Sequence, residues 1–218
     1  MVEKSQRQLL CASLNLALKA PSMPDSPTSE DIAEIRAALG TRAIVLVGLM
    51  GAGKSSVGRR LAEKLNLPFV DADNEIEAAA GKTIAEIFAD HGEDYFREGE
   101  RRVIARLLDN GCQVLATGGG AYMNNETKER IKVHGISIWL KADFDILLKR
   151  VSKRTDRPLL RGEDTASVLK RLMAIRYPVY AQADVIVESR DVQHGHMVNE
   201  VIHALATWPG LKVDANVQ

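Results

Sequence analysis

Apolar positions along this 218-residue chain follow two alternating patterns. Short, nearly continuous apolar runs are typical of strands that are buried on both faces of a parallel sheet. Between them, apolar residues recur every three or four positions, which predicts amphipathic helices. Five strands are expected, at residues 44–47, 67–71, 112–117, 136–140 and 184–187. The alternation over residues 43–208 therefore predicts an α/β fold in which helices cover both faces of a mainly parallel sheet.

The chain before the first expected strand has a different composition. Residues 1–28 hold a mildly apolar stretch, interrupted by a polar residue, and then a linker rich in proline and serine. This pattern favours a poorly ordered leader, or a short helix that packs loosely on the surface, over an export signal. Ser26 or Thr28 is expected to cap a short helix that ends at Gly40. The expected division is an N-terminal extension at 1–40, one domain at 41–210 and a tail at 211–218.

Composition narrows the class of protein. The apolar content of 45% suffices for one sizeable core, and 29 basic residues balance 29 acidic residues. Without a basic excess, neither nucleic acid nor a membrane surface is an expected partner, and no apolar run approaches the length of a membrane-spanning helix. The two cysteines have no metal-ligand spacing, which suits a reducing compartment. We therefore expect a monomeric, cytoplasmic protein.

The first strand leads into a glycine-rich turn, Gly-Leu-Met-Gly-Ala-Gly-Lys-Ser at residues 48–55, and then into an apolar helical stripe. This order of strand, glycine loop and helix is that of a P-loop. Glycines let successive N–H groups point at an anion, and the first turn of the helix adds the positive end of its dipole. Lys54 is expected to reach the β- and γ-phosphates of a nucleotide, and the Ser55 hydroxyl to ligate Mg²⁺.

Candidate polar residues also follow the next two strands. Asp71 and Asp73 come at the end of the second strand, and three glycines at 118–120 follow the third. Because the carboxyl ends of parallel strands share one edge of the sheet, we expect these residues to lie beside the phosphates. Two other interpretations stay open at this point. An aspartate can serve only as a helix cap, and the glycines can form a plain flexible turn.

Arginines provide the remaining candidates. Arg97 lies among aromatic residues near the start of a long helix, where a cation opposes the helix dipole, although a solvated surface position is also compatible. Arg176 lies at the end of an apolar helical stripe, which is costly unless an anion receives it. Residues 152–162, which include Arg157, form a basic loop that is typical either of a mobile lid over phosphates or of a solvated charge run.

Missing motifs limit the subclass of P-loop protein. The chain has neither Asp-x-x-Gly nor Asn-Lys-x-Asp, so guanine recognition as in small GTPases is unsupported. No apolar strand ending in aspartate follows the long helix, as a typical motor ATPase would show. The acidic strand end comes early, at residues 71–73, close to the P-loop in sequence. This arrangement fits small phosphotransferases.

Several separate motifs together resemble the shikimate kinase family, over about residues 43–205. They are the glycine loop, Asp71-Ala72-Asp73, Phe96-Arg97, the three glycines, Arg157-Pro158-Leu159-Leu160 and Arg176-Tyr177-Pro178-Val179-Tyr180. The resemblance implies a three-layer P-loop kinase fold with a mainly parallel five-stranded sheet and a mobile lid. It also implies ATP and Mg²⁺ as cofactors. The implied reaction converts shikimate to shikimate 3-phosphate, with release of ADP, in the biosynthesis of chorismate and the aromatic amino acids.

The same resemblance implies a role for each matched residue. Asp73 is similar to the aspartate that binds the ring hydroxyls and is a candidate base, and Arg97 and Arg176 to the pair that holds the substrate carboxylate. Asp71 is similar to a carboxylate that holds Mg²⁺, and Arg157 to a lid arginine at the transferring phosphate. The substrate is expected to lie against Gly118, Gly119 and Gly120, with an apolar wall at Ile84, Phe88 and Phe96. The nucleotide is expected at Gly48, Gly51, Ala52, Gly53, Lys54, Ser55, Ser56, Arg150, Arg157 and Arg190.

Chemistry supports this substrate independently, because guanidinium groups suit a carboxylate, whereas a carboxylate and backbone donors suit ring hydroxyls. Two alternatives compete with it. A gluconate kinase shares the fold and also takes an anionic polyol, but its substrate motifs do not match Phe96-Arg97 or Arg176-Tyr177-Pro178. A non-catalytic nucleotide-binding regulator is opposed by the intact set of Lys54, Ser55, Asp71, Asp73 and Arg157.

Overall fold

The structure is a computed structural model that describes residues 26–152 and 164–211, apart from the side chain of His194. Within these ranges the chain forms a single sheet of five parallel strands in the order β2-β3-β1-β4-β5. This confirms the predicted parallel sheet. The basic loop with Arg157 lies outside the described residues. The strands are β1 (Ala43–Val47), β2 (Phe69–Asp71), β3 (Val114–Ala116), β4 (Gly135–Ala142) and β5 (Val185–Ser189).

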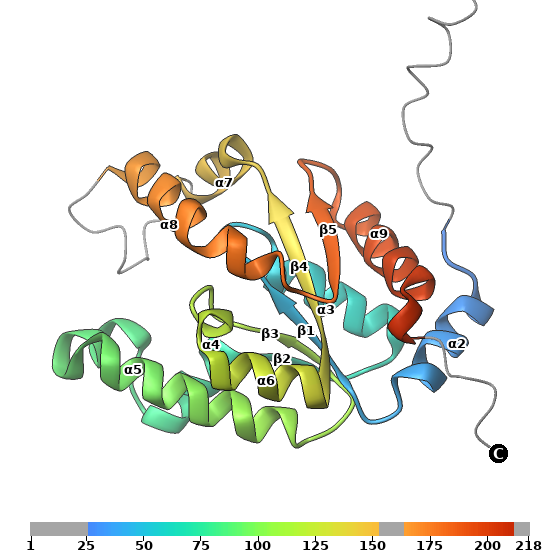
Figure 1. The fold of residues 1–218 in the computed structure, drawn as a ribbon, viewed down its shortest axis with the longest axis horizontal. Coiled ribbons are helices and arrows are strands. Elements are labelled where there is room, and N and C mark those ends of the chain that lie inside the picture. The colour runs from blue at the N-terminus through green and yellow to red at the C-terminus, as the bar shows by residue number, and fades with distance from the viewer. Residues whose placement is uncertain (1–25, 153–163, 212–218) are drawn as a thin grey trace, which may run out of the picture.

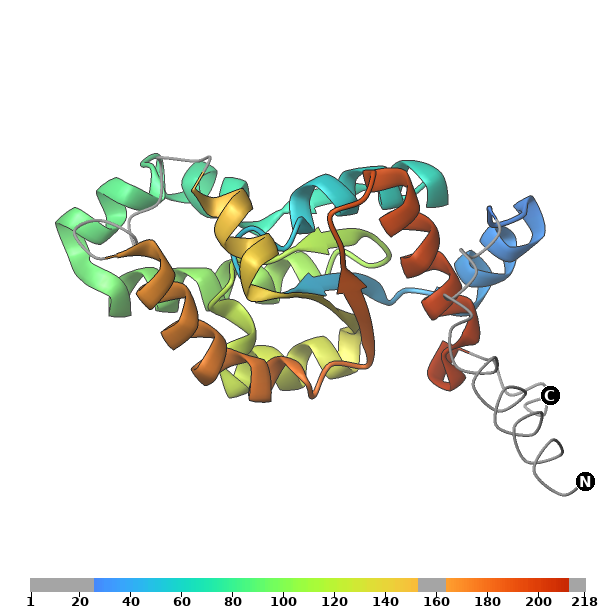
Figure 2. The same ribbon diagram turned by 90° about the horizontal axis from the view of Figure 1, so that it is seen from above.

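Helices cover both faces of the sheet, so the molecule has three layers (Figures 1 and 2). On one face, α3 (Lys54–Leu65) packs against β1, β2 and β3, and α9 (His194–Thr207) packs against β5. On the other face, α6 (Asn125–His134) packs against β4 and also contacts α5 (Ile84–Leu108). The other helices are α2 (Ser29–Leu39), α4 (Ala72–Ala80), α7 (Phe144–Val151), α8 (Thr165–Tyr180) and the short 3₁₀ helices η1 (Ala121–Met123) and η3 (Pro209–Leu211).

The burial of the strands explains their sequence patterns. All five residues of β1 are fully buried, because this strand lies in the middle of the sheet between two helical layers. At the edge of the sheet, β5 alternates instead: Val185 and Val187 are buried and Ile186 is exposed. Within the described ranges no helix combines the length and the apolar character that crossing a membrane requires.

The N-terminal helix α2 is capped by Thr28, one of the two predicted caps. The Thr28 hydroxyl accepts a hydrogen bond from the Asp31 N–H (3.1 Å), and the Asp31 carboxylate accepts one from the Thr28 N–H (2.8 Å). Ile35 and Leu39 bury the inner face of this helix in the common core. Arg42 then donates hydrogen bonds to carbonyl oxygens at both Ala38 (2.8 Å) and Gly210 (3.2 Å). The two ends of the described chain are therefore tied together.

The structure adds one feature that the apolar pattern does not predict and refines another. The segment between the three glycines and β4 forms η1 and α6, which the pattern misses because only Thr127 and Ile131 of α6 are buried. The sequence feature that could have predicted α6 is its N-cap, Asn124, whose side chain accepts a hydrogen bond from the Thr127 N–H (3.0 Å). A glycine inside a helical pattern predicts a break, and the break within α5 is a single residue, Gly92, with φ 82° and ψ 178°.

Candidate active site

The register of the sheet places three strand ends side by side. Asp71 of β2 pairs with Ala116 of β3, and Ala116 pairs with Leu46 of β1. The P-loop begins two residues after Leu46, and the three glycines begin two residues after Ala116. The glycine turn at 118–120 therefore lies between the P-loop and the corner at Asp71, as the parallel sheet predicted.

The P-loop is held in shape by hydrogen bonds to its carbonyl groups. Gly48 has φ 137°, and a methyl group added there would lie 2.8 Å from the Leu140 carbonyl oxygen, so only glycine fits. The Ser189 hydroxyl donates a hydrogen bond to the Ala52 carbonyl (2.9 Å), and the Arg150 guanidinium donates one to the Gly51 carbonyl (3.2 Å). These bonds hold the Gly51 and Ala52 carbonyls from outside the loop, and within it the Ala52 N–H donates a hydrogen bond to the Leu49 carbonyl (3.2 Å).

Lys54 lies over this loop at the first position of α3. Its ammonium group donates hydrogen bonds to the carbonyl oxygens of Gly48 (2.7 Å) and Leu49 (3.0 Å). The preceding Gly53 caps the helix without a side-chain hydrogen bond, so the positive end of the helix dipole faces the loop. Cation, loop and helix end therefore lie together after the carboxyl end of β1, and the predicted binding of phosphates there stays a prediction.

Ser55 and Asp71 meet at the side of the P-loop and form a candidate metal site. The Ser55 hydroxyl donates a hydrogen bond to Asp71 Oδ2 (2.6 Å), while Asp71 Oδ1 accepts one from the Asp73 N–H (3.1 Å) and caps α4. Asp71 is therefore a helix cap that also lies beside the P-loop serine, and its predicted role in holding Mg²⁺ stays a prediction. Two adjacent oxygen ligands suit Mg²⁺, which keeps several water or phosphate ligands. The described residues contain no cluster of three or more His, Cys, Asp or Glu that could hold a metal ion by themselves.

The glycine turn brings the predicted charged residues together. A methyl group added at Gly118 would lie 3.0 Å from Asp73 Oδ1, and one at Gly119 would lie 3.2 Å from the Arg176 guanidinium. At Gly120 it would collide with the Arg97 guanidinium. Three charged side chains from three separate helices therefore surround a turn that has no side chains of its own, where a small ligand can approach the backbone closely.

Glu100 belongs to this cluster and was not predicted. It is only 2% exposed, and its Oε2 accepts a hydrogen bond from Arg97 (2.7 Å), whereas its buried Oε1 has no hydrogen-bond partner among the described residues. Burial raises the pKa of Glu100, and the charge of Asp73 adds to this rise, whereas Arg97 and Arg176 oppose it. Glu100 follows Arg97 by three residues on one helix, and this spacing is the sequence feature from which their contact could have been predicted.

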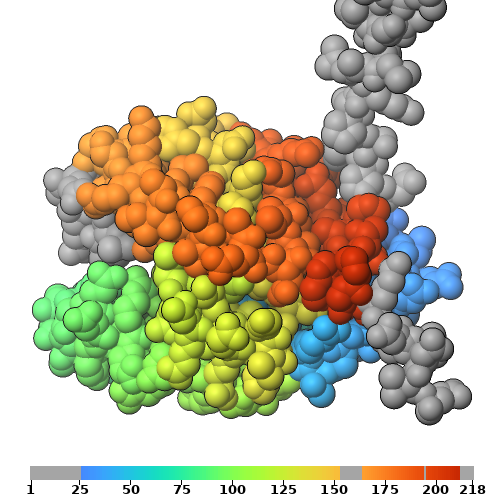
Figure 3. Space-filling model, in the orientation of Figure 1, coloured from blue at the N-terminus to red at the C-terminus, as the bar shows by residue number. Residues whose placement is uncertain are grey.

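The two arginines differ in their surroundings. Arg97 also forms an ion pair with Glu93 (3.0 Å), and its guanidinium lies over the Phe96 ring, 5.0 Å from the centroid. Phe96 in turn packs on Phe88, with ring centroids 4.7 Å apart, where the apolar wall was predicted. Arg176 is 8% exposed and lies on α8, across from α5 in the space-filling view (Figure 3). Neither residue is a solvated surface arginine.

The three arginines predicted to bind the nucleotide, Arg150, Arg157 and Arg190, do not all lie at the P-loop in the described structure. Arg150 lies against the P-loop and also donates hydrogen bonds to the Ser189 hydroxyl (3.1 Å) and the Arg190 carbonyl (2.6 Å). The guanidinium of Arg190 instead pairs with Glu200 of α9 (3.7 Å). Arg157 lies outside the described residues. Arg150 is therefore the arginine that the described structure brings to the phosphate loop.

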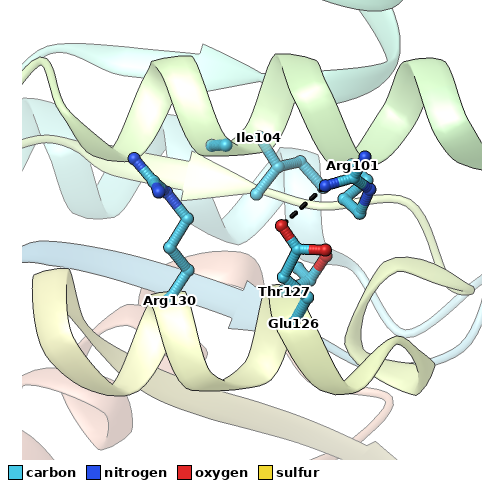
Figure 4. Close-up of a pocket in the computed structure, with 6 residues that line it drawn as sticks. Arg101, Ile104, Glu126, Thr127 and Arg130 are labelled. Carbon is cyan, nitrogen blue, oxygen red and sulfur yellow. Dashed lines mark hydrogen bonds and ion pairs between the residues drawn. The ribbon is translucent and has the colours of Figure 1, made fainter.

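A crevice between α5 and α6 lies apart from this cluster (Figure 4). It is bridged by the ion pair between Arg101 and Glu126 (2.6 Å). None of the residues that the sequence assigned to a site lines it. Its lining consists of Arg101, Ile104, Ala105, Glu126, Thr127 and Arg130.

Comparison with known proteins gives one consistent family. A sequence model of the shikimate kinase family matches residues 50–206. The shikimate kinase of Rhodopseudomonas palustris is 60% identical over 173 residues, which cover 79% of this chain and 85% of that protein. The shikimate kinase of Caulobacter vibrioides is 58% identical over 177 residues, which cover 81% and 86%. The structure of a shikimate kinase from Acinetobacter baumannii in complex with shikimate superposes with a TM-score of 0.74 at 37% identity, covering 78% of this chain and 95% of that one.

Proposed function

The chain belongs to the shikimate kinase family, and from this premise we propose how its residues divide the work of the reaction. The protein is an ATP-dependent kinase that uses Mg²⁺ and phosphorylates the 3-hydroxyl of shikimate. Relatives of about 60% identity over most of the chain are shikimate kinases, so the gluconate kinase and regulator alternatives are not favoured. The observation that carries the division of roles is the glycine turn, which joins the P-loop to a cluster of buried charges.

The phosphate end neutralises and aligns the triphosphate. The N–H groups of the P-loop and the start of α3 hold the phosphates, and Lys54 exchanges its two carbonyl partners for phosphate oxygens. Ser55 and Asp71 hold Mg²⁺, whose charge offsets that of the β- and γ-phosphates. Phosphoryl transfer needs little covalent help from the protein, so alignment and charge neutralisation supply most of the acceleration. Arg157 lies outside the described residues, and its role as a lid arginine at the transferring phosphate stays a prediction from the sequence.

The substrate end holds shikimate by its two kinds of polar group. Arg97 and Arg176 receive the carboxylate, for which planar guanidinium groups are suited. Asp73 and the glycine turn receive the ring hydroxyls. Asp73 accepts the proton of the 3-hydroxyl while the oxygen of that hydroxyl bonds to the γ-phosphorus and the bond to ADP breaks. The substrate carboxylate competes with Glu93 and Glu100 for Arg97, because both already contact its guanidinium.

One set of assays tests this assignment. ADP release from Mg·ATP is measured with shikimate, gluconate and nucleoside monophosphates, and with a shikimate analogue whose carboxylate is a neutral amide. Shikimate should be strongly preferred over every other acceptor. Arg97→Ala and Arg176→Ala should each raise the KM for shikimate by roughly ten- to two-hundredfold, since a charge-assisted hydrogen bond is worth about 1.5–3 kcal/mol, and should leave the KM for ATP unchanged.

Arg101→Ala is the matched control for these variants. Arg101 lies one turn after Arg97 on the same helix, but its guanidinium pairs with Glu98 (2.7 Å) and Glu126 (2.6 Å) away from the glycine turn. Its removal should leave both KM values unchanged. Equal turnover of the acid and the amide by the wild-type enzyme would contradict the carboxylate clamp.

We also propose that residues 41–210 carry the activity and that the extension at 1–40 contributes only stability, through α2. The burial of Ile35 and Leu39 supports this contribution, at about 1.5–3 kcal/mol for each side chain. Removal of residues 1–25 should leave kcat and the melting temperature unchanged. Removal of residues 1–40 should lower the melting temperature and leave the KM values unchanged. A truncation at 40 that raises the KM for ATP or shikimate would place part of the extension in the site.

We further propose a cytoplasmic monomer. The exposed large apolar residues of the described surface lie on different elements, as Tyr95 of α5, Val133 of α6 and Ile186 of β5 do, and single residues of this kind do not indicate an interface. A chain with two cysteines suits a reducing compartment, where ATP is also available. Light scattering should give a mass near 23.9 kDa. A mass twice as large at micromolar concentration would contradict the monomer.

A further inference from the structure

Tyr180 contacts both parts of the substrate end at once. It is the last residue of α8, its side chain is fully buried, and its hydroxyl donates a hydrogen bond to the carbonyl oxygen of Gly119. Arg176 lies one helical turn earlier, and its guanidinium lies beside the same glycine, because a methyl group added at Gly119 would lie 3.2 Å from it. One phenol group thus connects a carboxylate-binding arginine with the glycine turn.

The contact with Gly119 determines the direction of a backbone donor. In a planar trans peptide unit, the carbonyl of one residue points opposite to the N–H of the next residue. A carbonyl of Gly119 that is held by Tyr180 therefore fixes the direction of the Gly120 N–H. Gly119 is also the point where the turn meets the P-loop, because a methyl group added there would lie 3.5 Å from the Gly48 carbonyl oxygen and 3.7 Å from the Met50 nitrogen.

Aromatic packing holds the phenol in this position. The ring of Tyr180 lies 5.8 Å from that of Trp139 on β4 and 6.5 Å from that of Tyr122, measured between centroids. Burial raises the pKa of Tyr180 to about 12, although the nearby charge of Arg176 opposes this rise. The hydroxyl therefore keeps its proton at neutral pH and remains a donor to Gly119.

We propose that Tyr180 is a positioning residue for shikimate, which sets the guanidinium of Arg176 and the N–H of Gly120 at a fixed mutual distance. The inference rests on the proposed function, in which the arginine and the turn bind the two ends of the substrate. Without the hydroxyl, both groups keep their chemistry and lose their common anchor. Shikimate binding should then weaken, while nucleotide binding, which uses the other side of the glycine turn, should not.

Tyr177 provides a matched control on the same helix. Its hydroxyl also donates a hydrogen bond to a backbone carbonyl, at Ala142, and burial raises its pKa to about 12 as well. Its ring packs edge-on against Trp139, with centroids 4.9 Å apart. Ala142 is the last residue of β4 and not part of the glycine turn, so the two tyrosines differ mainly in the backbone group that each one holds.

The test compares Tyr180→Phe with Tyr177→Phe. Tyr180→Phe should raise the KM for shikimate by about three- to tenfold, the range expected for one buried hydrogen bond, with kcat and the KM for ATP nearly unchanged. It should also reduce the preference for shikimate over its amide analogue, because Arg176 is less well placed. Tyr177→Phe should lower the melting temperature about as much as Tyr180→Phe does, because each variant loses one buried hydrogen bond. It should change the KM neither for shikimate nor for ATP. Equal effects of the two variants on the KM for shikimate overturn the inference.

Arg176→Ala separates this inference from the proposed function. If Arg176→Ala leaves the KM for shikimate unchanged, the carboxylate clamp itself is wrong and the inference is lost with it. If Arg176→Ala raises that KM and Tyr180→Phe does not, only the positioning role is wrong. Should Tyr180→Phe fail to fold, fluorinated tyrosines at position 180 change the acidity of the phenol at nearly constant shape. The KM for shikimate should then vary with that acidity, and a constant KM would overturn the role.

Discussion

The two ends of the active site are built in different ways. The phosphate end is built mainly from one stretch at residues 48–55, with Asp71 and Arg150 beside it, and its proposed binding groups are mainly backbone N–H groups and the start of one helix. The substrate end takes its side chains from three helices, with Asp73 from α4, Arg97 from α5 and Arg176 from α8. The first depends on local chain geometry, and the second depends on how helices far apart in the sequence pack around the glycine turn. Nucleotide binding is thus a property of a motif, and substrate choice is a property of the fold.

The two ends also differ in their electrostatics. At the phosphate end, Lys54 lies half-buried and Ser55 is exposed, so the charges there remain close to water. At the substrate end, Glu100 is 2% and Arg176 is 8% exposed. Buried charges cost free energy unless they are paired, so this cluster is stable only as a complete set. A change at the phosphate end should therefore affect activity alone, whereas a change at the substrate end should affect stability as well.

The largest expected effect is that of Lys54→Ala, which should reduce turnover below detection and leave the melting temperature nearly unchanged. In the proposed role the ammonium group contacts the phosphates, and in the structure it lies over the P-loop carbonyls and outside the core, so its loss should remove charge stabilisation without a packing defect. Lys64→Ala is the control on the same helix, because Lys64 donates a hydrogen bond to Asn199 on α9 (2.8 Å) instead. Near-normal turnover of Lys54→Ala in a steady-state assay would remove the central assignment of the phosphate end.

Asp73→Asn should have the next largest effect, and it distinguishes chemistry from anchoring at the substrate end. The substitution keeps the size of the side chain and part of its hydrogen bonding, but it removes basicity and charge. If Asp73 is the base, kcat should fall by about 10²–10⁴ while the KM for shikimate changes little. A weaker KM with an unchanged kcat would limit Asp73 to binding the ring hydroxyls.

The smallest expected effect concerns the pH dependence of stability, through Glu100→Gln. The pKa of Glu100 is raised above its usual 4.5 in the folded protein, mainly by burial. The stabilising contribution of a group with a raised folded pKa is complete below the unfolded pKa and is lost as the pH rises through the folded pKa. The wild type should therefore lose stability relative to Glu100→Gln as the pH rises above about 4.5, by about 1.4 kcal/mol for each unit of the rise in pKa.

Urea denaturation of both proteins between pH 4 and pH 8 measures this difference. Glu93→Gln is the control, because Glu93 contacts the same arginine from an exposed position, with 55% of its side chain accessible. Its difference from the wild type should not vary with pH in the same way. A parallel pH dependence for the wild type and Glu100→Gln would show that the buried carboxylate carries no such cost.

Most of the architecture could be read from the sequence, because strands that are buried on both faces and amphipathic helices have distinct periodicities. The five strands, the cap at Thr28 and the break at Gly92 all follow from local patterns. Helix α6 was missed because its apolar face is short. The roles of the matched arginines and of Asp73 depend on the family resemblance. The sequence around a single arginine does not show whether its side chain is solvated on the surface or binds a ligand.

By itself, the sequence determined the parallel sheet, the P-loop and the edge of the sheet where ligands bind, because these depend on residues that are neighbours along the chain. Only the tertiary structure decided which carboxylate faces Arg97, and which phenol holds the glycine turn. The spacing of Glu100 from Arg97 and the place of Tyr180 in the motif at 176–180 are visible in the sequence, but neither pattern shows that the side chain is buried or what it contacts. Their importance comes from burial beside charges and backbone groups of distant segments, and the free energy of such contacts depends on distance and desolvation, which are settled only when the helices pack.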